Sequence, residues 1–399
     1  MATYKEQNKL NVPHLRFPEF HGEWCVSTIG EQFDLYSGNT PSRLNKEHFE
    51  GNVNWITSGE LKEHYISDTK EKISEDAATA NNLKLLHPGT FVIAIYGLEA
   101  DGVRGTGSIT CKESTISQAC MAFTQKGDVK NEFLYSWYKK HGNIIGIKYA
   151  QGTKQQNLSY DILEKFHIAF PSQDEQDKLI KFISLLDERI ATQSKLIEDL
   201  KKLKSAIIEI EYTPNTKTTS HIGNVIEQIS KRNKNNAIQN VLSVSNRQGF
   251  IKQSDQFENR NVASEDTSNY KIVEKNDFAF NPARINVGSI ARLTTFEKGI
   301  VSPMYICFRT QENVAPEYID FFFESKHFYC EIQKRLEGSV RQCLSFEGLC
   351  NIPFSLPTLE MQQRIGKRLF TLGQKIKTET DLLELLNKQK QYLLRQMFI

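Results

Sequence analysis

The chain has 399 residues, of which 39% are hydrophobic and 25% are charged, and its formal net charge is +2 at pH 7. This composition excludes a largely disordered protein, and the length favours two or three domains over a single core. The nearly neutral charge gives no support for a nucleic-acid partner but does not exclude one, because local basic patches determine such binding. The first 20 residues contain no apolar run of the length of a signal peptide or membrane span, which predicts a cytoplasmic protein without membrane contact.

Residues 1–171 are predicted to form a globular α+β domain with a short lead-in at its N-terminal end. Apolar runs such as FVIAIYG, from Phe91, are short and β-like, and they alternate with turn-rich stretches. The segment NEFLYSWYKKH, from Asn131, is typical of a short amphipathic helix.

Seven cysteines are scattered along the chain and never form a C-x-x-C pair. An odd number without metal-binding spacing supports neither disulfides nor a zinc site, and it predicts buried free thiols instead. The residues are Cys25, Cys111, Cys120, Cys307, Cys330, Cys343 and Cys350.

Residues 172–212 and 358–399 are each predicted to form one long helix. In the first, apolar residues recur at alternating steps of four and three, interrupted only by the polar Gln193 and Lys204. The positions are 179, 183, 186, 190, 193, 197, 200, 204 and 207. Positions 365 to 393 repeat this spacing, with Glu379 and Lys390 as the polar interruptions. The pattern predicts the seam of a coiled coil. A proline, Pro171 or Pro357, precedes each helix, where proline is tolerated.

Residues 213–357 are predicted to form a second globular α+β domain that repeats the first. The stretch GTKQQNLSYDILEKFHIAFP, from Gly152, corresponds to GSVRQCLSFEGLCNIPFSLP, from Gly338, and the offset of 186 residues continues through both helices. Such a fixed offset is the signature of an internal repeat. Two copies in one chain can be related by a pseudo-two-fold axis, which would make the two helices antiparallel. The alternative is that each long helix packs on its own domain.

Motifs for catalysis were not found. The chain has no P-loop, no G-x-G-x-x-G and no H-E-x-x-H, and the FNPAR stretch from Phe280 shares only Asn-Pro with the tetrapeptide of adenine methyltransferases. The sequence therefore predicts no catalytic residue, no metal site and no cofactor.

The polar turn that ends each domain is a candidate for reading DNA. Gln can make bidentate hydrogen bonds to adenine and Arg to guanine, and the two turns differ at their tips, Lys154-Gln155 against Val340-Arg341. Several arginines also fall in loops rather than in regular elements, which favours phosphate or base contacts. The alternative is an ordinary turn in which Ser159 and Ser345 cap the following helices.

The whole layout resembles the specificity subunit of type I restriction–modification systems. The resemblance rests on NVPHLRFPEFHGEW, IGEQFDLYSGNTP and the two closing stretches with the helix starts SQDEQDKLI and TLEMQQRI, and it covers essentially the full chain. It implies two target recognition domains, each reading one half of a bipartite double-stranded DNA sequence. It also implies spacer helices that pair as an antiparallel coiled coil, set the gap between the half-sites and dock two methyltransferase subunits that carry S-adenosylmethionine. The resemblance further implies a translocating restriction subunit that joins these for cleavage. One departure is that the second domain lacks the Gly-x-Thr-Pro that follows Ile29-Gly30 in the first.

The predicted DNA-contacting residues lie in loops of both domains. In the first domain they are Ser37, Thr40, Arg43, Thr57, Ser58, Tyr96, Arg104, Lys154, Gln155, Gln156 and Asn157. In the second they are Ser245, Asn246, Arg247, Arg284, Asn286, Arg341 and Gln342. Two other functions stay open: a fused restriction or methylation enzyme with an unrecognised active site, and a coiled-coil adaptor that binds proteins only.

Overall fold

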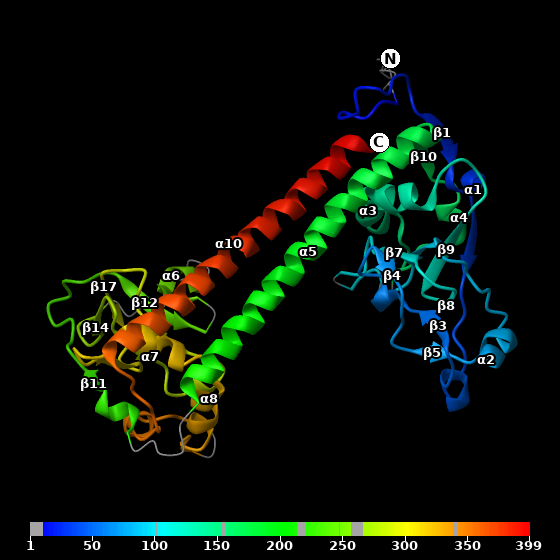
Figure 1. Ribbon diagram of the computed structural model, residues 1–399. Helices are drawn as coiled ribbons and strands as arrows, with labels where there is room; N and C mark the ends of the chain where they lie inside the picture. Colours follow the sequence, from blue (N-terminus) through cyan, green and yellow to red (C-terminus); the bar gives the residue numbers. More distant parts are fainter. Residues whose placement is uncertain are drawn as a thin grey trace. The chain divides into compact units, whose positions relative to one another are not determined.

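The computed structural model describes residues 11–100, 102–152, 156–213, 220–246, 248–256, 266–338 and 342–399. It divides into two compact units. The first unit comprises Met1–Ser194 with Leu382–Ile399, and the second comprises Lys195–Asp381. Each unit holds one globular α+β domain together with parts of two long helices, α5 (Gln173–Tyr212) and α10 (Leu359–Met397) (Figure 1).

The first domain is built on a five-stranded sheet in the order β2-β9-β6-β7-β4 and a three-stranded sheet in the order β5-β3-β8. Helix α3 (Asn131–Tyr149) packs on β6, β7 and β9 (Figure 1), and its Phe133 joins Phe91 and Phe123 in the core. A separate pair joins β1, near the start of the domain, with β10, which lies just before α5 in the chain. The strands are β1 (Cys25–Thr28), β2 (Phe33–Ser37), β3 (Val53–Ile56), β4 (Tyr65–Ile66), β5 (Lys72–Ile73), β6 (Phe91–Ala94), β7 (Gly107–Thr110), β8 (Ser114–Ile116), β9 (Cys120–Gln125) and β10 (His167–Phe170). The short helices are α1 (Ile29–Gln32), η1 (Lys46–Phe49), η2 (Ser58–Glu60), α2 (Glu75–Ala80) and α4 (Tyr160–Leu163).

The second domain is built on two four-stranded sheets, in the orders β11-β18-β15-β16 and β13-β12-β17-β14. Its largest core cluster is aromatic and includes Phe278, Phe308 and Phe322. The strands are β11 (Ile226–Ile229), β12 (Val241–Ser245), β13 (Gly249–Lys252), β14 (Lys271–Glu274), β15 (Phe278–Phe280), β16 (Ile290–Arg292), β17 (Lys298–Val301) and β18 (Ile306–Thr310). The helices are η3 (Ile222–Asn224), α6 (Gln253–Gln256), η4 (Ile285–Val287), α7 (Pro316–Phe322), α8 (Lys326–Gln333) and α9 (Phe346–Cys350).

The two domains repeat the same strand connections, which confirms the predicted internal repeat. The order β2-β9-β6-β7 corresponds to β11-β18-β15-β16, and the parallel pair β3–β8 corresponds to β12–β17. The polar turn also recurs as a structure. Gly152 and Gly338 have positive φ angles of 111° and 104°, and the bridge Gln151–Asn157 matches Glu337–Cys343. Glycine is favoured at both positions because a Cβ would be strained there.

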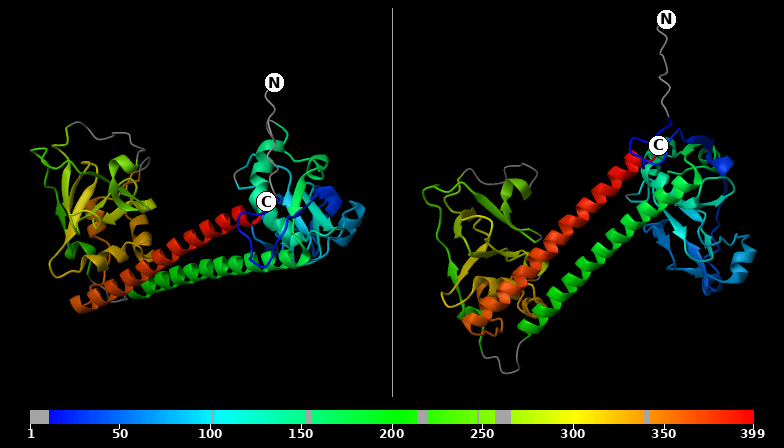
Figure 2. Two further views of the ribbon diagram at one scale, coloured as in Figure 1. Left: turned by 90° about the horizontal axis from the view of Figure 1, so that it is seen from above. Right: turned by 45° about the horizontal axis from the view of Figure 1, so that its top comes forward.

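Both long helices contribute to the core of both units. In the first unit, Leu179 and Ile183 of α5 share a cluster with Leu394 and Met397 of α10. In the second unit, Ile207 and Ile208 of α5 share a cluster with Ile365 and Leu369 of α10. The start of each helix thus packs with the end of the other, and the two lie side by side in Figures 1 and 2. All predicted seam positions are buried or half-buried. The antiparallel coiled coil is confirmed, and separate packing of each helix on its own domain is wrong.

The end of each helix docks on the domain that precedes the other helix. The Trp137 indole N–H donates to the carbonyl oxygen of Ile399 (3.1 Å), and Phe398 packs against Phe133. In the second unit the Tyr212 hydroxyl donates to the carbonyl oxygen of Tyr318 (2.6 Å). These buried contacts anchor α10 to the first domain and α5 to the second.

Burial of the cysteines is only partly as predicted. All seven are free, and Cys120 in β9 and Cys307 in β18 are buried. The prediction of burial is wrong for Cys25, Cys111 and Cys330, which are exposed because they lie at a strand edge, in a turn and on the outer face of α8. Over the residues that the structure describes, no helix is both long and apolar enough to cross a bilayer. The domain boundaries at 171, 212 and 357 stay predictions; α5 begins at Gln173 and α10 at Leu359.

Candidate DNA interface

Four loops of the first domain meet where strands of its two sheets end. The N–H of Asn39 donates to the carbonyl oxygen of Ile116 (3.2 Å), and that of Ser117 donates to Ile56 (2.9 Å). The N–H of Ile95 donates to Ala119 (2.9 Å), and the carbonyl oxygen of Ile95 accepts from Leu158 (2.9 Å). These bonds connect the loops that carry seven of the predicted residues: Ser37, Thr40, Thr57, Ser58, Tyr96, Gln156 and Asn157.

Arg104 ties two of these loops together. Its Nε donates to the carbonyl oxygen of Leu98 (2.9 Å), and its Nη2 lies 3.5 Å from Gln156 Oε1. The Gln156 backbone is held from both sides, since its N–H donates to a Glu99 carboxylate oxygen (2.8 Å) and its carbonyl oxygen accepts from Leu98 (3.1 Å). Arg104 is half-buried and, through these hydrogen bonds, braces the loop that presents Gln156.

Arg43 is held in a fixed orientation by an acidic partner and two aromatic rings. Its two terminal nitrogens each lie 2.8 Å from an oxygen of Glu71, and its guanidinium lies over the rings of Phe49 (5.0 Å) and Trp55 (5.8 Å). The hydrogen bonds between the two side chains raise the pKa of Arg43 and lower the pKa of Glu71. An exposed, oriented guanidinium is suited to a group with two neighbouring acceptor atoms, such as a phosphate or the O6/N7 edge of guanine.

Thr57 has a structural role that the sequence reasoning did not assign. Its N–H and its hydroxyl both lie within hydrogen-bonding distance of Glu60 Oε2, at 2.9 and 3.0 Å. The other oxygen of Glu60 accepts from the N–H of Lys70 (2.7 Å). Thr57 and Glu60 thus form a capping box that shapes the loop carrying Ser58.

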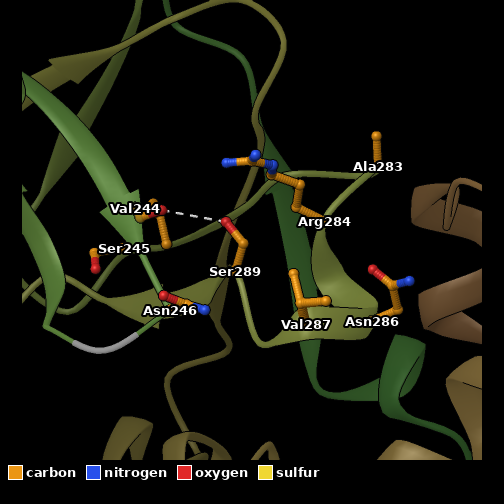
Figure 3. A pocket seen from close by; sticks show the side chains of 8 residues that line it. All are labelled: Val244, Ser245, Asn246, Ala283, Arg284, Asn286, Val287 and Ser289. Atoms are coloured by element: carbon orange, nitrogen blue, oxygen red, sulfur yellow. Dashed lines mark hydrogen bonds between the residues drawn. The ribbon is translucent and has the colours of Figure 1, made fainter. Parts of the chain in front are cut away.

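In the second domain, four predicted residues line one pocket of about 530 Å³ (Figure 3). The pocket lies between the end of β12 and the turn around η4, which ends at Gly288 with a positive φ of 87°. The Ser289 hydroxyl at its base donates to the carbonyl oxygen of Val244 (3.2 Å), and the side chain of Arg284 extends over this pair in Figure 3. The lining residues are Val244, Ser245, Asn246, Ala283, Arg284, Asn286, Val287 and Ser289. An arginine and amides around one concavity can donate and accept hydrogen bonds at a base edge.

The second polar turn lies next to this pocket. The N–H of Leu344, two residues after the exposed Gln342, donates to the carbonyl oxygen of Pro282 (3.1 Å), two residues before Arg284. Ser345 caps α9 through its hydroxyl, which accepts from the N–H of Gly348 (3.0 Å). Ser159 occupies the same position before α4 without a side-chain capping bond to the described residues. The remaining predicted residues, Lys154, Gln155, Arg247 and Arg341, lie outside the described residues.

Sequence reasoning missed the residues that shape the interface from a distance. Glu71, which orients Arg43, is 28 residues away from it, and Ser289 is 45 residues away from Val244, which lies in β12. The only local signal was the turn sequence INVGS from Ile285, whose glycine permits the positive φ. Within the described ranges, no group of three or more His, Cys, Asp or Glu side chains is placed to hold a metal ion.

Comparison with known proteins places this architecture in one family. The family model described as the type I restriction modification DNA specificity domain matches residues 21–202 and again residues 208–388. The MjaVIII specificity subunit of Methanocaldococcus jannaschii is 24% identical over 98% of this chain and 94% of its own length. The MjaIX specificity subunit of the same organism is 28% identical, but that match spans only 45% of this chain and 42% of that protein.

A solved structure shares the fold over nearly the full length. The S subunit from M. genitalium superposes with a TM-score of 0.62 at 18% identity, covering 97% of this chain and 99% of that one. A chain from a structure titled for complex assembly of the type I R-M system gives a TM-score of 0.55 at 14% identity. Two matches of the family model cover most of the chain, one for each domain and its helix. The chain therefore belongs to the family of type I restriction–modification specificity subunits and carries two tandem copies of its DNA specificity domain.

Proposed function

We propose that each domain reads one half of a bipartite double-stranded DNA target and that α5 and α10 set the gap between the halves. The observation that carries the proposal is the repeat itself. Two domains of the same topology are each anchored on both of two continuous helices. A domain that reads DNA needs one set of loops, so two sets in one chain suit two half-sites. The predicted residues that meet at loop junctions in each domain are the reading surfaces.

We also propose that the helices dock two methyltransferase subunits. Leu196, Leu203 and Ile210 follow one another at intervals of seven on α5, and their side chains are 40%, 50% and 76% exposed. On α10, Phe370, Leu385 and Tyr392 are exposed as well. Rows of exposed apolar side chains on a helix mark a contact with another protein. Restriction subunits join through this complex, and the chain works in the cytoplasm without catalysis or a cofactor of its own.

The proposal is tested by methylome sequencing of a host that expresses the chain with its methyltransferase. The modified sites should form a bipartite motif. Exchange of residues 1–171 for the corresponding domain of another family member should then change one half of the motif and leave the other half and the gap intact. An exchange that alters both halves, or neither, contradicts the proposal. Methylation or cleavage by the purified chain alone would instead favour a fused enzyme.

An adaptor function makes a different prediction for DNA binding. Phosphate contacts are strongest at low salt, so a complex that reads DNA should retard its duplex there and release it as salt rises. Failure of the complex with methyltransferase to retard any duplex at low salt would favour an adaptor that binds proteins only.

A further inference from the structure

His64, which lies just before β4 in the first domain, is held between two carboxylates. Its Nδ1 lies 3.1 Å from Asp187 Oδ2, and its Nε2 lies 2.9 Å from Glu132 Oε2. A neutral imidazole has only one N–H and cannot donate to both carboxylates, whereas an imidazolium can. The ring is also stacked between Tyr65 and Tyr135, with centroids 4.1 and 3.9 Å away, an arrangement that favours a cation. The geometry is that of a charged histidine.

This histidine connects the edge of the sheet with three helices. Its carbonyl oxygen accepts from the N–H of Ile109 in β7 (2.8 Å), so its backbone belongs to the sheet edge. Glu132 lies at the start of α3, and Asp187 lies on α5. The second oxygen of Asp187 pairs with Lys390 of α10. The side chains of His64 and Asp187 are only 12% and 17% exposed, so the charges interact with little screening by solvent.

The second unit has an arginine beside α7, the helix that corresponds to α3. Arg292 ends β16, the edge strand that corresponds to β7, and its side chain is only 8% exposed. It lies 2.7 Å from Glu317 and 3.1 Å from Asp320 on α7. Glu317 is the second residue of α7, as Glu132 is of α3, and α7 meets α10 where Gly366 permits close approach to Glu317. A titratable cation therefore joins the domain to α5 in the first unit, whereas in the second unit a permanent cation is paired with α7, the helix that contacts α10.

We propose that charged His64 is a positioning residue that holds the first recognition domain on α5 and α10, and that alkaline pH releases this contact while the Arg292 contact persists. The proposal rests on the proposed function of the domains and adds a difference between them. At alkaline pH the first half-site is read less selectively, because its domain is no longer held in one orientation on its helices. Reading of the second half-site does not change.

The direction of the pH effect follows from the charges around the ring. Burial disfavours the imidazolium, but the hydrogen bonds to Asp187 and Glu132 outweigh it and raise the pKa of His64 above its ordinary 6.5. Burial likewise opposes the charge of Asp187, but His64 and Lys390 keep its pKa below 3.8. A raised histidine pKa means that the contact is complete below 6.5 and is lost as the pH rises through the raised value.

Other titratable groups face the same cluster. Burial raises the pKa of Tyr65 to about 12 and raises the pKa of Tyr135 as well, so both rings stay neutral in this range. Lys139 lies 5.1 Å from the Tyr135 ring, and burial together with Lys390 lowers its pKa to about 8. Glu63 and Cys111 lie near the tyrosines. Lys139 is thus the group whose titration must be separated from that of His64.

The test uses the full chain in complex with its methyltransferase. Affinity is measured between pH 6.5 and 9 for the target and for two duplexes, each with one half-site scrambled. Discrimination at the first half-site should fall with rising pH while that at the second stays constant. The fall should be complete once the pH exceeds the raised pKa of His64, and it should be about tenfold in the docking equilibrium for each pH unit by which the NMR titration finds that pKa raised. Equal responses of the two half-sites would overturn the proposal.

Variants separate His64 from the other groups. His64→Gln should lower discrimination at the first half-site at every pH, and His64→Arg, which stays charged, should keep it at pH 9. Arg292→His should transfer the pH dependence to the second half-site. Lys139→Arg should keep the wild-type profile; a flat profile in this variant would assign the effect to Lys139 and overturn the proposal. His87→Gln is the matched control, because the His87 side chain is 85% exposed.

A readout without DNA tests the contact on its own. NMR of the histidine rings in the full chain should show one pKa above 6.5 that is missing in His64→Gln. Hydrogen exchange in residues 131–149 and 382–397, corrected for its intrinsic pH dependence, should accelerate at pH 9 in the wild type but not in His64→Arg. If the wild-type complex reads no bipartite target at pH 6.5, the proposed function fails, and these two measurements still decide whether His64 holds the domain on the helices.

Discussion

Gln176 and Gln362, 186 residues apart, make equivalent hydrogen bonds at the two joints between a domain and its long helix. Gln176 Oε1 accepts from the N–H of Lys130 (3.0 Å), which precedes α3, and Gln362 Oε1 accepts from that of Ala315 (2.9 Å), which precedes α7. Each side-chain amide donates to the carbonyl oxygen of the proline before its helix, at 3.0 and 2.9 Å. Both glutamines are almost completely buried, so each joint is a fixed hydrogen-bonded corner.

Replacement of either glutamine by leucine should destabilise the chain. Each change leaves a buried N–H and a buried carbonyl oxygen unpaired, and a cost of about 1–3 kcal/mol is expected for an unsatisfied buried group. Urea denaturation followed by fluorescence measures the loss. Gln389→Leu on the exposed face of α10 is the control and should have little effect. A loss no larger than that of the control would show that water replaces the bonds.

Lengthening the coiled coil should widen the gap between the half-sites. An insertion of seven residues after Leu200, with an equal insertion in α10 after Leu372, preserves the seam and adds about 10 Å of helix. At about 3.4 Å per base pair, the gap in the methylated motif should grow by about three base pairs. Methylome sequencing reads the new spacing directly. An unchanged gap would contradict the role of the helices as a spacer.

Arg284→Ala should weaken recognition of the second half-site only. Loss of a bidentate contact from the pocket to a base should remove about 1–3 kcal/mol of discrimination at one position. Competition binding with single-base variants of the target, at fixed salt, measures it. Arg364→Ala, an exposed arginine on α10, should leave discrimination unchanged. A uniform loss of affinity for all sequences would assign Arg284 to a phosphate instead.

The exposed apolar row on α5 should be needed for binding the methyltransferase. Changing Leu196, Leu203 and Ile210 to serine should abolish copurification, because each side chain contributes about 1.5–3 kcal/mol when fully buried in an interface. Stability of the isolated chain should change little, since all three side chains are exposed in it. The matched control changes Lys195, Lys201 and Lys202 to serine. Normal copurification of the apolar variant would show that the partner binds elsewhere.

Alkylation should distinguish the buried from the exposed cysteines. Burial raises the pKa of Cys120 and of Cys307 to about 12, so neither forms the reactive thiolate at pH 8 in the folded chain. Cys25, Cys111 and Cys330 are exposed and should be labelled by iodoacetamide first. Mass spectrometry after brief labelling, with a urea-unfolded sample as control, gives the order. Early labelling of Cys120 would show that β9 opens readily.

The elements that follow from local patterns were predictable. The long helices were predictable because apolar residues recur at steps of three and four and a proline precedes each helix, and both signals lie within one segment of sequence. The seam positions are buried or half-buried, as expected. The repeat was readable because both copies keep residues such as Gln176 and Gln362 at a constant offset. The hydrogen-bond partners of the glutamines could not be predicted, because each partner lies in another part of the chain, just before α3 for Gln176 and just before α7 for Gln362.

By itself, the sequence determined the two α+β domains and the paired helices, since periodicity and repetition are properties of the chain alone, and its motifs carried the resemblance to the family. Only the tertiary structure decided which loops share a surface and which charges meet. Arg284 and Asn246 line one pocket because β12 and the η4 turn are neighbours in space. His64 meets Asp187, 123 residues away, and Asp187 meets Lys390, 203 residues further along the chain. Such contacts depend on strand order and helix pairing, which long-range packing sets and local propensity does not.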